Sequence, residues 1–155
     1  MKTAKNNSLD QVDGRIIAEL CREGRVSVAE LSRRVNLSKT ACQARIRRLE
    51  RTGHILGYRA IVDPKRFGRP HVAFVEVKLS DTRGAALAAF NAAVRALPEV
   101  EQCHMIASSF DYLLKVRTKD IADYRAVLGE KISSLPHVAQ TSTHVSMEAV
   151  KDDLD

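Results

Sequence analysis

A repeated six-residue pattern in the second half of the chain restricts its fold more than any other feature. The segment Leu-Pro-Glu-Val-Glu-Gln at 97–102 returns as Leu-Pro-His-Val-Ala-Gln at 135–140, an offset of 38 residues. Apolar residues at helical spacing precede each copy, and the proline in each copy ends the helix. Strands are predicted at 71–79, 100–108, 110–117 and 138–147. The order strand–helix–strand, twice over, predicts a ferredoxin-like βαββαβ domain.

One face of this predicted sheet has no helix to cover it. Both helices of a ferredoxin-like domain pack on the same side of the antiparallel sheet. A chain of 155 residues divided into two small domains also buries little apolar surface per domain. We therefore expect a second subunit to cover the free face if that face is apolar.

The first half of the chain carries the spacing of three short helices. An apolar stripe runs from Leu9 to Leu20, and Gly24 follows it. Ser27 is predicted to cap a second helix, with Glu30 three residues later as the other half of a capping box. Asn36 suits the left-handed conformation that ends a helix.

Ser38 is predicted to cap a third helix that runs to about Arg51, and Gly53 ends it. The run Ile55–Val62 is rich in β-branched and aromatic residues and predicts the hairpin of a wing. Three helices and a hairpin in this order make a winged helix-turn-helix, whose third helix enters the major groove of DNA. The fold class is therefore α+β.

The third helix has two chemically different faces. Cys42, Ile46 and Leu49 form a narrow apolar stripe that should pack inward. Gln can read adenine and Arg can read guanine through paired hydrogen bonds, while Ser38 suits a phosphate. Arg48 lies off the groove face and is predicted to contact a phosphate. The predicted DNA-binding residues are Ser38, Lys39, Thr40, Gln43, Arg47, Arg48 and Arg51. Arg45 flanks the stripe and is open to either a carboxylate partner or DNA.

Charge is distributed unevenly between the two halves. Residues 1–70 hold 16 Lys and Arg against 7 Asp and Glu, a net charge of +9, whereas residues 71–155 hold 9 against 12, a net charge of −3. A basic half that coincides with a helix-turn-helix pattern indicates binding to a polyanion, here double-stranded DNA.

The three cysteines and the termini exclude several classes of protein. Cys21, Cys42 and Cys103 are odd in number and form no CxxC pair, so neither a disulfide framework nor a zinc ribbon is expected. Cys21 and Cys42 are expected to be core thiols. Neither a signal peptide nor a transmembrane run is predicted, and we expect a cytoplasmic protein without a cofactor.

The predicted organisation has four parts. Residues 1–8 form a disordered arm, 9–63 the winged helix-turn-helix, 64–70 a linker, and 71–155 the ferredoxin-like domain.

Motifs along nearly the whole chain resemble the Lrp/AsnC family, the leucine-responsive and feast/famine transcription regulators. The resemblance is carried by Leu-Asp-x-x-Asp-x-x-Ile-Ile-x-x-Leu from Leu9, Gly24-Arg25, the run from Leu37 to Tyr58, and Phe-Asp-Tyr-Leu-Leu-Lys-Val from Phe110. Met-Glu-x-Val-Lys from Met147 closes the series.

This resemblance implies dimers through the ferredoxin-like domain, which is the regulation-of-amino-acid-metabolism domain of the family. It also implies assembly of dimers into higher oligomers, often octamers, and an amino-acid effector bound between domains. The implied effector residues are Met105, Ala107, Ser108, Ser109, Phe110, Asp111 and Tyr112, together with Thr141, Thr143 and His144 of the last strand. For Asp111 and His144, capping of the turn and an ordinary place in the sheet are the respective alternatives.

Segments 74–80 and 103–105 resemble the family branch that activates proline catabolism. That resemblance implies proline as the effector and the proline dehydrogenase gene as the target, with leucine as another candidate effector. Ser108-Ser109 departs from the glycine and acidic residue that the family often has before Phe-Asp.

Two other functions fit parts of the sequence. An architectural DNA protein with little sequence preference would share the basic helix, although Thr40 and Gln43 favour base reading. Some haem-pathway decarboxylases are similar to the family in fold, but they need no Arg-rich recognition helix, and no catalytic motif is present. The sequence therefore predicts a regulator and not an enzyme.

Overall fold

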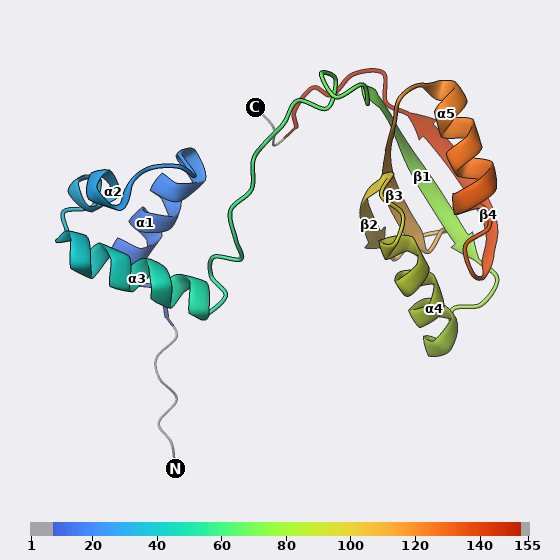
Figure 1. Cartoon of the computed structure of the whole chain (residues 1–155). Coiled ribbons are helices and arrows are strands. Elements are labelled where there is room, and N and C mark those ends of the chain that lie inside the picture. The colour runs from blue at the N-terminus through green and yellow to red at the C-terminus, as the bar shows by residue number, and fades with distance from the viewer. Residues whose placement is uncertain (1–7, 153–155) are drawn as a thin grey trace, which may run out of the picture. The chain divides into compact units, whose positions relative to one another are not determined.

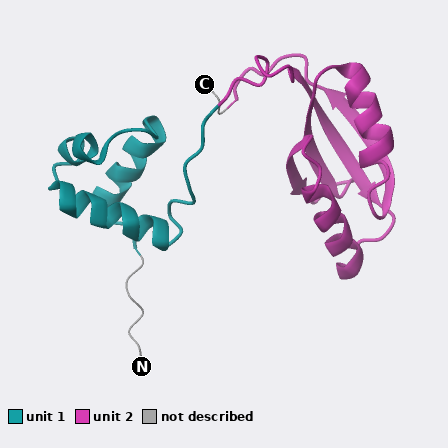
Figure 2. Cartoon of the chain, in the orientation of Figure 1, with its two compact units in different colours: residues 1–61 teal, residues 62–155 magenta. Residues whose placement is uncertain are grey.

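The chain divides into two compact units, residues 1–61 and 62–155 (Figure 2). The structure is a computed structural model that describes residues 8–152. All of the predicted arm except Ser8 lies outside the described residues. The division at Ile61 comes just before the predicted linker, 64–70. None of the helices among the described residues is long and apolar enough to cross a membrane.

The first unit consists of three helices, α1 (Gln11–Arg22), α2 (Val28–Arg34) and α3 (Lys39–Arg51) (Figure 1). Its core is a small group of fully buried apolar side chains, namely Ile16, Leu31, Val35, Cys42 and Leu49. The turn between α2 and α3 passes through Asn36 with φ of 56°, the left-handed conformation that the sequence predicts there. The helix-turn-helix is thus present with the predicted bounds of its third helix.

Polar caps fix where the helices of this unit begin, and they differ in part from the prediction. Ser27 Oγ accepts a hydrogen bond from the Glu30 N–H at 3.1 Å. Glu30 binds Arg33 and Arg34 with its carboxylate, so the predicted reciprocal capping box at α2 is wrong. A reciprocal box forms instead at α1, between Asp10 and Asp13.

The predicted wing is not formed as a hairpin. Residues 55–62 contain no strand. Two short strands alone are marginally stable, and the helical remainder of this unit offers no third strand to support them. Tyr58 turns back toward α3 and donates a hydrogen bond from its hydroxyl to Glu50 Oε1 at 3.1 Å.

Cys21 is exposed, so its prediction as a core thiol is wrong, whereas Cys42 is buried as predicted. Cys21 follows the buried Ile16 by five residues, which turns it about 140° away around the helix.

The second unit is the predicted ferredoxin-like sandwich. Its elements are β1 (His71–Leu79), α4 (Gly84–Arg95), β2 (Val100–Met105), β3 (Tyr112–Thr118), α5 (Ile121–Ala126), η1 (Val127–Ile132) and β4 (Val138–Val145). The sheet order is β2-β3-β1-β4, with every neighbouring pair antiparallel. The second helix ends in the π-helical turn η1, so the two sequence repeats are not identical in local structure.

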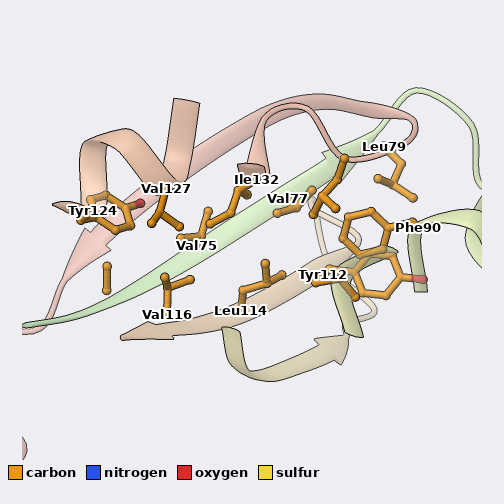
Figure 3. Close-up of a cluster of buried hydrophobic side chains, with 13 residues drawn as sticks. Val75, Val77, Leu79, Phe90, Tyr112, Leu114, Val116, Tyr124, Val127 and Ile132 are labelled. Carbon is orange, nitrogen blue, oxygen red and sulfur yellow. The ribbon is translucent and has the colours of Figure 1, made fainter. Parts of the chain in front are cut away.

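Alternate residues of β1 and β3 build the core of this unit against the two helices (Figure 3). Val75 and Val77 of β1 are fully buried, and the ring of Phe90 from α4 lies 4.4 Å from the ring of Tyr112 between centroids. Residues between these core positions, such as Phe74 and Leu113, therefore lie on the helix-free face of the sheet.

Candidate functional site

The outward face of α3 presents a set of exposed polar side chains. Ser38, Lys39, Thr40, Gln43, Arg47 and Arg51 are all exposed, while Cys42 and Leu49 are buried. Apart from Ser38, no side chain of this outward set takes part in a hydrogen bond or ion pair among residues 8–152. Three positive charges on this face are therefore available to a polyanion. Their contact with DNA stays a prediction.

Ser38 begins α3 as its N-cap. Its hydroxyl oxygen accepts a hydrogen bond from the Ala41 N–H at 3.2 Å. The first turn of the helix holds no acidic residue, so the positive end of the helix dipole is not neutralised there. The combination of free amides and a positive dipole end suits a phosphate group.

Arg45 and Arg48 lie on the inner flank of α3 and bind carboxylates of the first helix. Arg45 Nη1 is 2.6 Å from Asp10 Oδ2 and 2.8 Å from Asp13 Oδ1. Arg48 binds the other oxygen of Asp13. Of the two partners considered for Arg45, a carboxylate or DNA, the structure shows a carboxylate. Arg48, predicted as a phosphate contact, has a partner inside the protein.

Asp13 is the centre of this arrangement, which we call the Asp13 network: Asp10, Asp13, Arg45 and Arg48. Its side chain is fully buried. Burial alone would raise the pKa of Asp13, but hydrogen bonds from Arg48, the Asp10 N–H and Arg45 outweigh it and lower the pKa from 3.8 to about 2. Asp13 is therefore ionised at neutral pH. The sequence shows both aspartates only as part of the family motif, and nothing in their spacing indicates that they bind α3.

The turn between β2 and β3 is held by main-chain and side-chain bonds of Asp111. The Asp111 N–H donates to the Val77 carbonyl at 3.0 Å, and its carboxylate oxygen Oδ2 accepts from the Leu79 N–H at 2.7 Å. The Asp111 carboxylate therefore caps the turn and ties it to β1, which is the alternative given for Asp111 from the sequence. Its other oxygen, Oδ1, accepts no hydrogen bond from residues 8–152. Ala107, Ser108 and Ser109 are exposed at the tip, and Phe110 is half-buried.

The remaining predicted effector residues do not lie on one surface. Tyr112 is buried in the core, whereas Met105 is 57% exposed at the end of the edge strand β2. Thr141 and Thr143 of β4 face the helices, and Thr143 Oγ1 lies 2.6 Å from the Tyr124 hydroxyl. His144 is on the helix-free face, where its Nε2 is 3.2 Å from Glu76 Oε1. A single effector molecule cannot contact all of these side chains within one chain.

No group of three His, Cys, Asp or Glu side chains among residues 8–152 is arranged to hold a metal ion.

Comparisons with known proteins agree with both units. Residues 9–50 match the AsnC-type helix-turn-helix domain, and residues 72–154 match the Lrp/AsnC ligand binding domain. The chain is 60% identical over 148 residues to the proline dehydrogenase transcriptional activator of Rhizobium radiobacter, covering 96% of this chain and 95% of that protein. It is 43% identical to the leucine-responsive regulatory protein of Haemophilus influenzae, covering 97% and 91%.

Among solved structures, a transcriptional regulator of Neisseria meningitidis in complex with L-Met is similar to this fold, with a TM-score of 0.88 and 29% identity over 94% of each chain. An AsnC family regulator of Agrobacterium tumefaciens gives a TM-score of 0.88 at 30% identity, covering 93% of this chain and 94% of that one. The relatives are transcription regulators, which removes the decarboxylase alternative. With a DNA-binding unit and an amino-acid-binding unit both matched, the chain belongs to the Lrp/AsnC family of transcription regulators.

Proposed function

We propose that this regulator activates the gene for proline dehydrogenase and responds to proline. The unpaired polar and basic face of α3 carries the DNA-binding part of the proposal. The identity of 60% to two proteins named proline dehydrogenase transcriptional activator, from Rhizobium radiobacter and Rhodobacter capsulatus, supports the target and the direction of regulation. Such a regulator acts in the cytoplasm, where the bacterial chromosome lies.

In this mechanism Thr40, Gln43 and Arg47 contact bases, and Ser38, Lys39 and Arg51 contact phosphates. A Gln or Arg side chain with paired hydrogen bonds to its base discriminates by about 1–3 kcal/mol. The exposed positions of these side chains along a single helix face support base reading over purely architectural binding.

The proposed unit of function is a homodimer that assembles further, to an octamer. The support is the helix-free sheet face, where Phe74 is 36% exposed and Leu113 is half-buried. An effector bound between such subunits can act only by binding one arrangement of them more tightly than another. The spacing of the α3 helices, and hence the affinity for the operator, then follows the effector concentration.

Proline is expected to raise the melting temperature of the protein more than the other nineteen amino acids do. A ligand present at one hundred times its Kd stabilises the folded state by about 2.7 kcal/mol, which is a shift of several degrees for a domain of this size. A thermal-shift screen of the twenty amino acids measures this. A shift by leucine or methionine alone would reject proline as the effector, and no shift at all would reject an amino-acid effector.

Asp111→Asn is expected to abolish the response to proline while DNA binding persists. The asparagine side-chain oxygen can still accept from the Leu79 N–H, so the turn keeps its tie to β1. The negative charge that would pair with the ammonium group of proline is lost. Operator binding measured by fluorescence anisotropy over a proline titration tests this. The matched control is Asp81→Asn, because Asp81 pairs with Arg83 outside the β2–β3 turn. An unchanged proline dose–response for Asp111→Asn would remove Asp111 from the effector site.

A further inference from the structure

We propose that Asp13 is a positioning residue for DNA recognition, which fixes the rotation of α3 about its axis and withholds Arg45 and Arg48 from the DNA backbone. The inference rests on the proposed docking of α3 into the major groove. It assigns a role to the Asp13 network, which contains none of the side chains proposed to contact bases or phosphates.

The Asp13 carboxylate accepts three hydrogen bonds from within its own unit. Its Oδ1 accepts from Arg45, and its Oδ2 accepts from Arg48 and from the Asp10 N–H at 3.1 Å. The side chain is fully buried, and its lowered pKa keeps it charged. A buried carboxylate that loses its cations would remain uncompensated, so the structure favours the state in which both arginines are bound.

The hydrogen bonds of Arg45 and Arg48 constrain the rotation of α3 about its axis more tightly than its apolar packing does. The packing of Cys42, Ile46 and Leu49 sets which face of α3 is buried, but hydrophobic contacts are not themselves directional and leave smaller rotations open. Arg45 and Arg48 are one turn apart on α3 and meet a single carboxylate on α1. Two charge-assisted hydrogen bonds to one fixed point limit rotation of the helix, and therefore fix where its outward face points.

The same bonds reduce the sequence-independent attraction of α3 for DNA. The helix has five cationic side chains, and only Lys39, Arg47 and Arg51 lack a carboxylate partner in the described chain. Each phosphate neutralised by a cation adds about 0.9 to the slope of log K against log salt concentration, whatever the sequence. Asp13 occupies Arg48 and shares Arg45 with Asp10, and it thereby lowers binding to random DNA relative to binding to the operator.

The test compares the salt dependence of DNA affinity for Arg47→Ala and Arg48→Ala, two alanine variants one position apart on α3. Arg48→Ala is expected to leave the salt slope unchanged on random DNA, because Arg48 contacts Asp13. Arg47→Ala is expected to weaken operator binding at least about fivefold, as the loss of a base contact does. Both are measured by fluorescence anisotropy on operator and random duplexes over a salt series.

Asp13→Asn carries the second half of the test. It is nearly equal in shape to aspartate but removes the charge that binds Arg48, while Arg45 keeps its ion pair with Asp10, so the slope on random DNA is expected to steepen by about 0.9. The ratio of operator to random affinity should fall about tenfold, which is the worth of one displaced base contact. A role in folding alone would lower the folded fraction but leave the slope of the folded protein unchanged.

The outcomes separate this inference from the docking on which it rests. If Arg47→Ala leaves operator binding intact, the docking itself is wrong. If Arg47→Ala weakens binding but Arg48→Ala lowers the salt slope by about 0.9, Arg48 contacts phosphate and the inference is overturned. Should Asp13→Asn fail to fold by circular dichroism, the double variant Arg45→Gln/Arg48→Gln decides. An unchanged slope with reduced discrimination supports the inference, whereas a flatter slope with intact discrimination overturns it.

Discussion

Replacing Gln43 and Arg47 together by alanine is expected to abolish specific binding to the operator while leaving assembly intact. The two side chains are four residues apart on the exposed face of α3, and neither forms a hydrogen bond or ion pair with residues 8–152. The loss of two paired base contacts costs about 2–6 kcal/mol per bound helix, at least roughly thirtyfold in Kd. Alanine favours the helix at both positions, so the fold is expected to persist.

Fluorescence anisotropy with an operator duplex measures the affinity, and analytical ultracentrifugation measures assembly. Gln11→Ala/Arg15→Ala is a matched control, because it removes the same two residue types at the same spacing from the exposed surface of α1. The control variant should bind the operator as the parent does. Normal operator protection by the Gln43/Arg47 variant would contradict the proposed docking of α3.

Phe90→Ala is expected to lower the free energy of unfolding of the second unit by about 3–5 kcal/mol. Phe90 is fully buried between α4 and the sheet, and its ring lies against Tyr112. Truncation leaves a cavity in a core that has few other aromatic rings, and a small unit has little stability to lose. Binding of the effector and assembly should be lost along with this unit.

Urea unfolding followed by circular dichroism measures the change at fixed protein concentration. Phe67→Ala is the control, because Phe67 is 71% exposed and its removal should change stability by less than about 0.5 kcal/mol. Equal unfolding midpoints for the two variants would contradict the assignment of Phe90 to the core.

The features that the sequence predicts well are those that depend on neighbours along the chain. Ser27 and Ser38 cap their helices, Asn36 takes the left-handed conformation, and each Leu-Pro pair follows a helix and precedes a strand. These preferences depend on side chains within three or four residues.

The features that the sequence predicts poorly depend on partners far along the chain. The run 55–62 has the composition of a strand but lacks another strand in its unit, so composition alone gives the wrong structure. Arg48 looks like a phosphate contact until Asp13, 35 residues earlier, is found beside it. The predicted effector residues on β4 alternate between faces, which separates His144 from Thr143. A site that contacts all of the predicted effector residues would require more than one chain.

The cap of α3 has a chemical direction that matters at a DNA surface. Because Ser38 uses its oxygen to accept from Ala41, the hydroxyl proton remains for an acceptor beyond the helix, and a phosphodiester oxygen is such an acceptor. Aspartate would begin the helix equally well yet repel the same phosphodiester. Helix capping therefore accepts either serine or aspartate at position 38. Contact with DNA favours serine, because its hydroxyl is neutral and can donate to a phosphate.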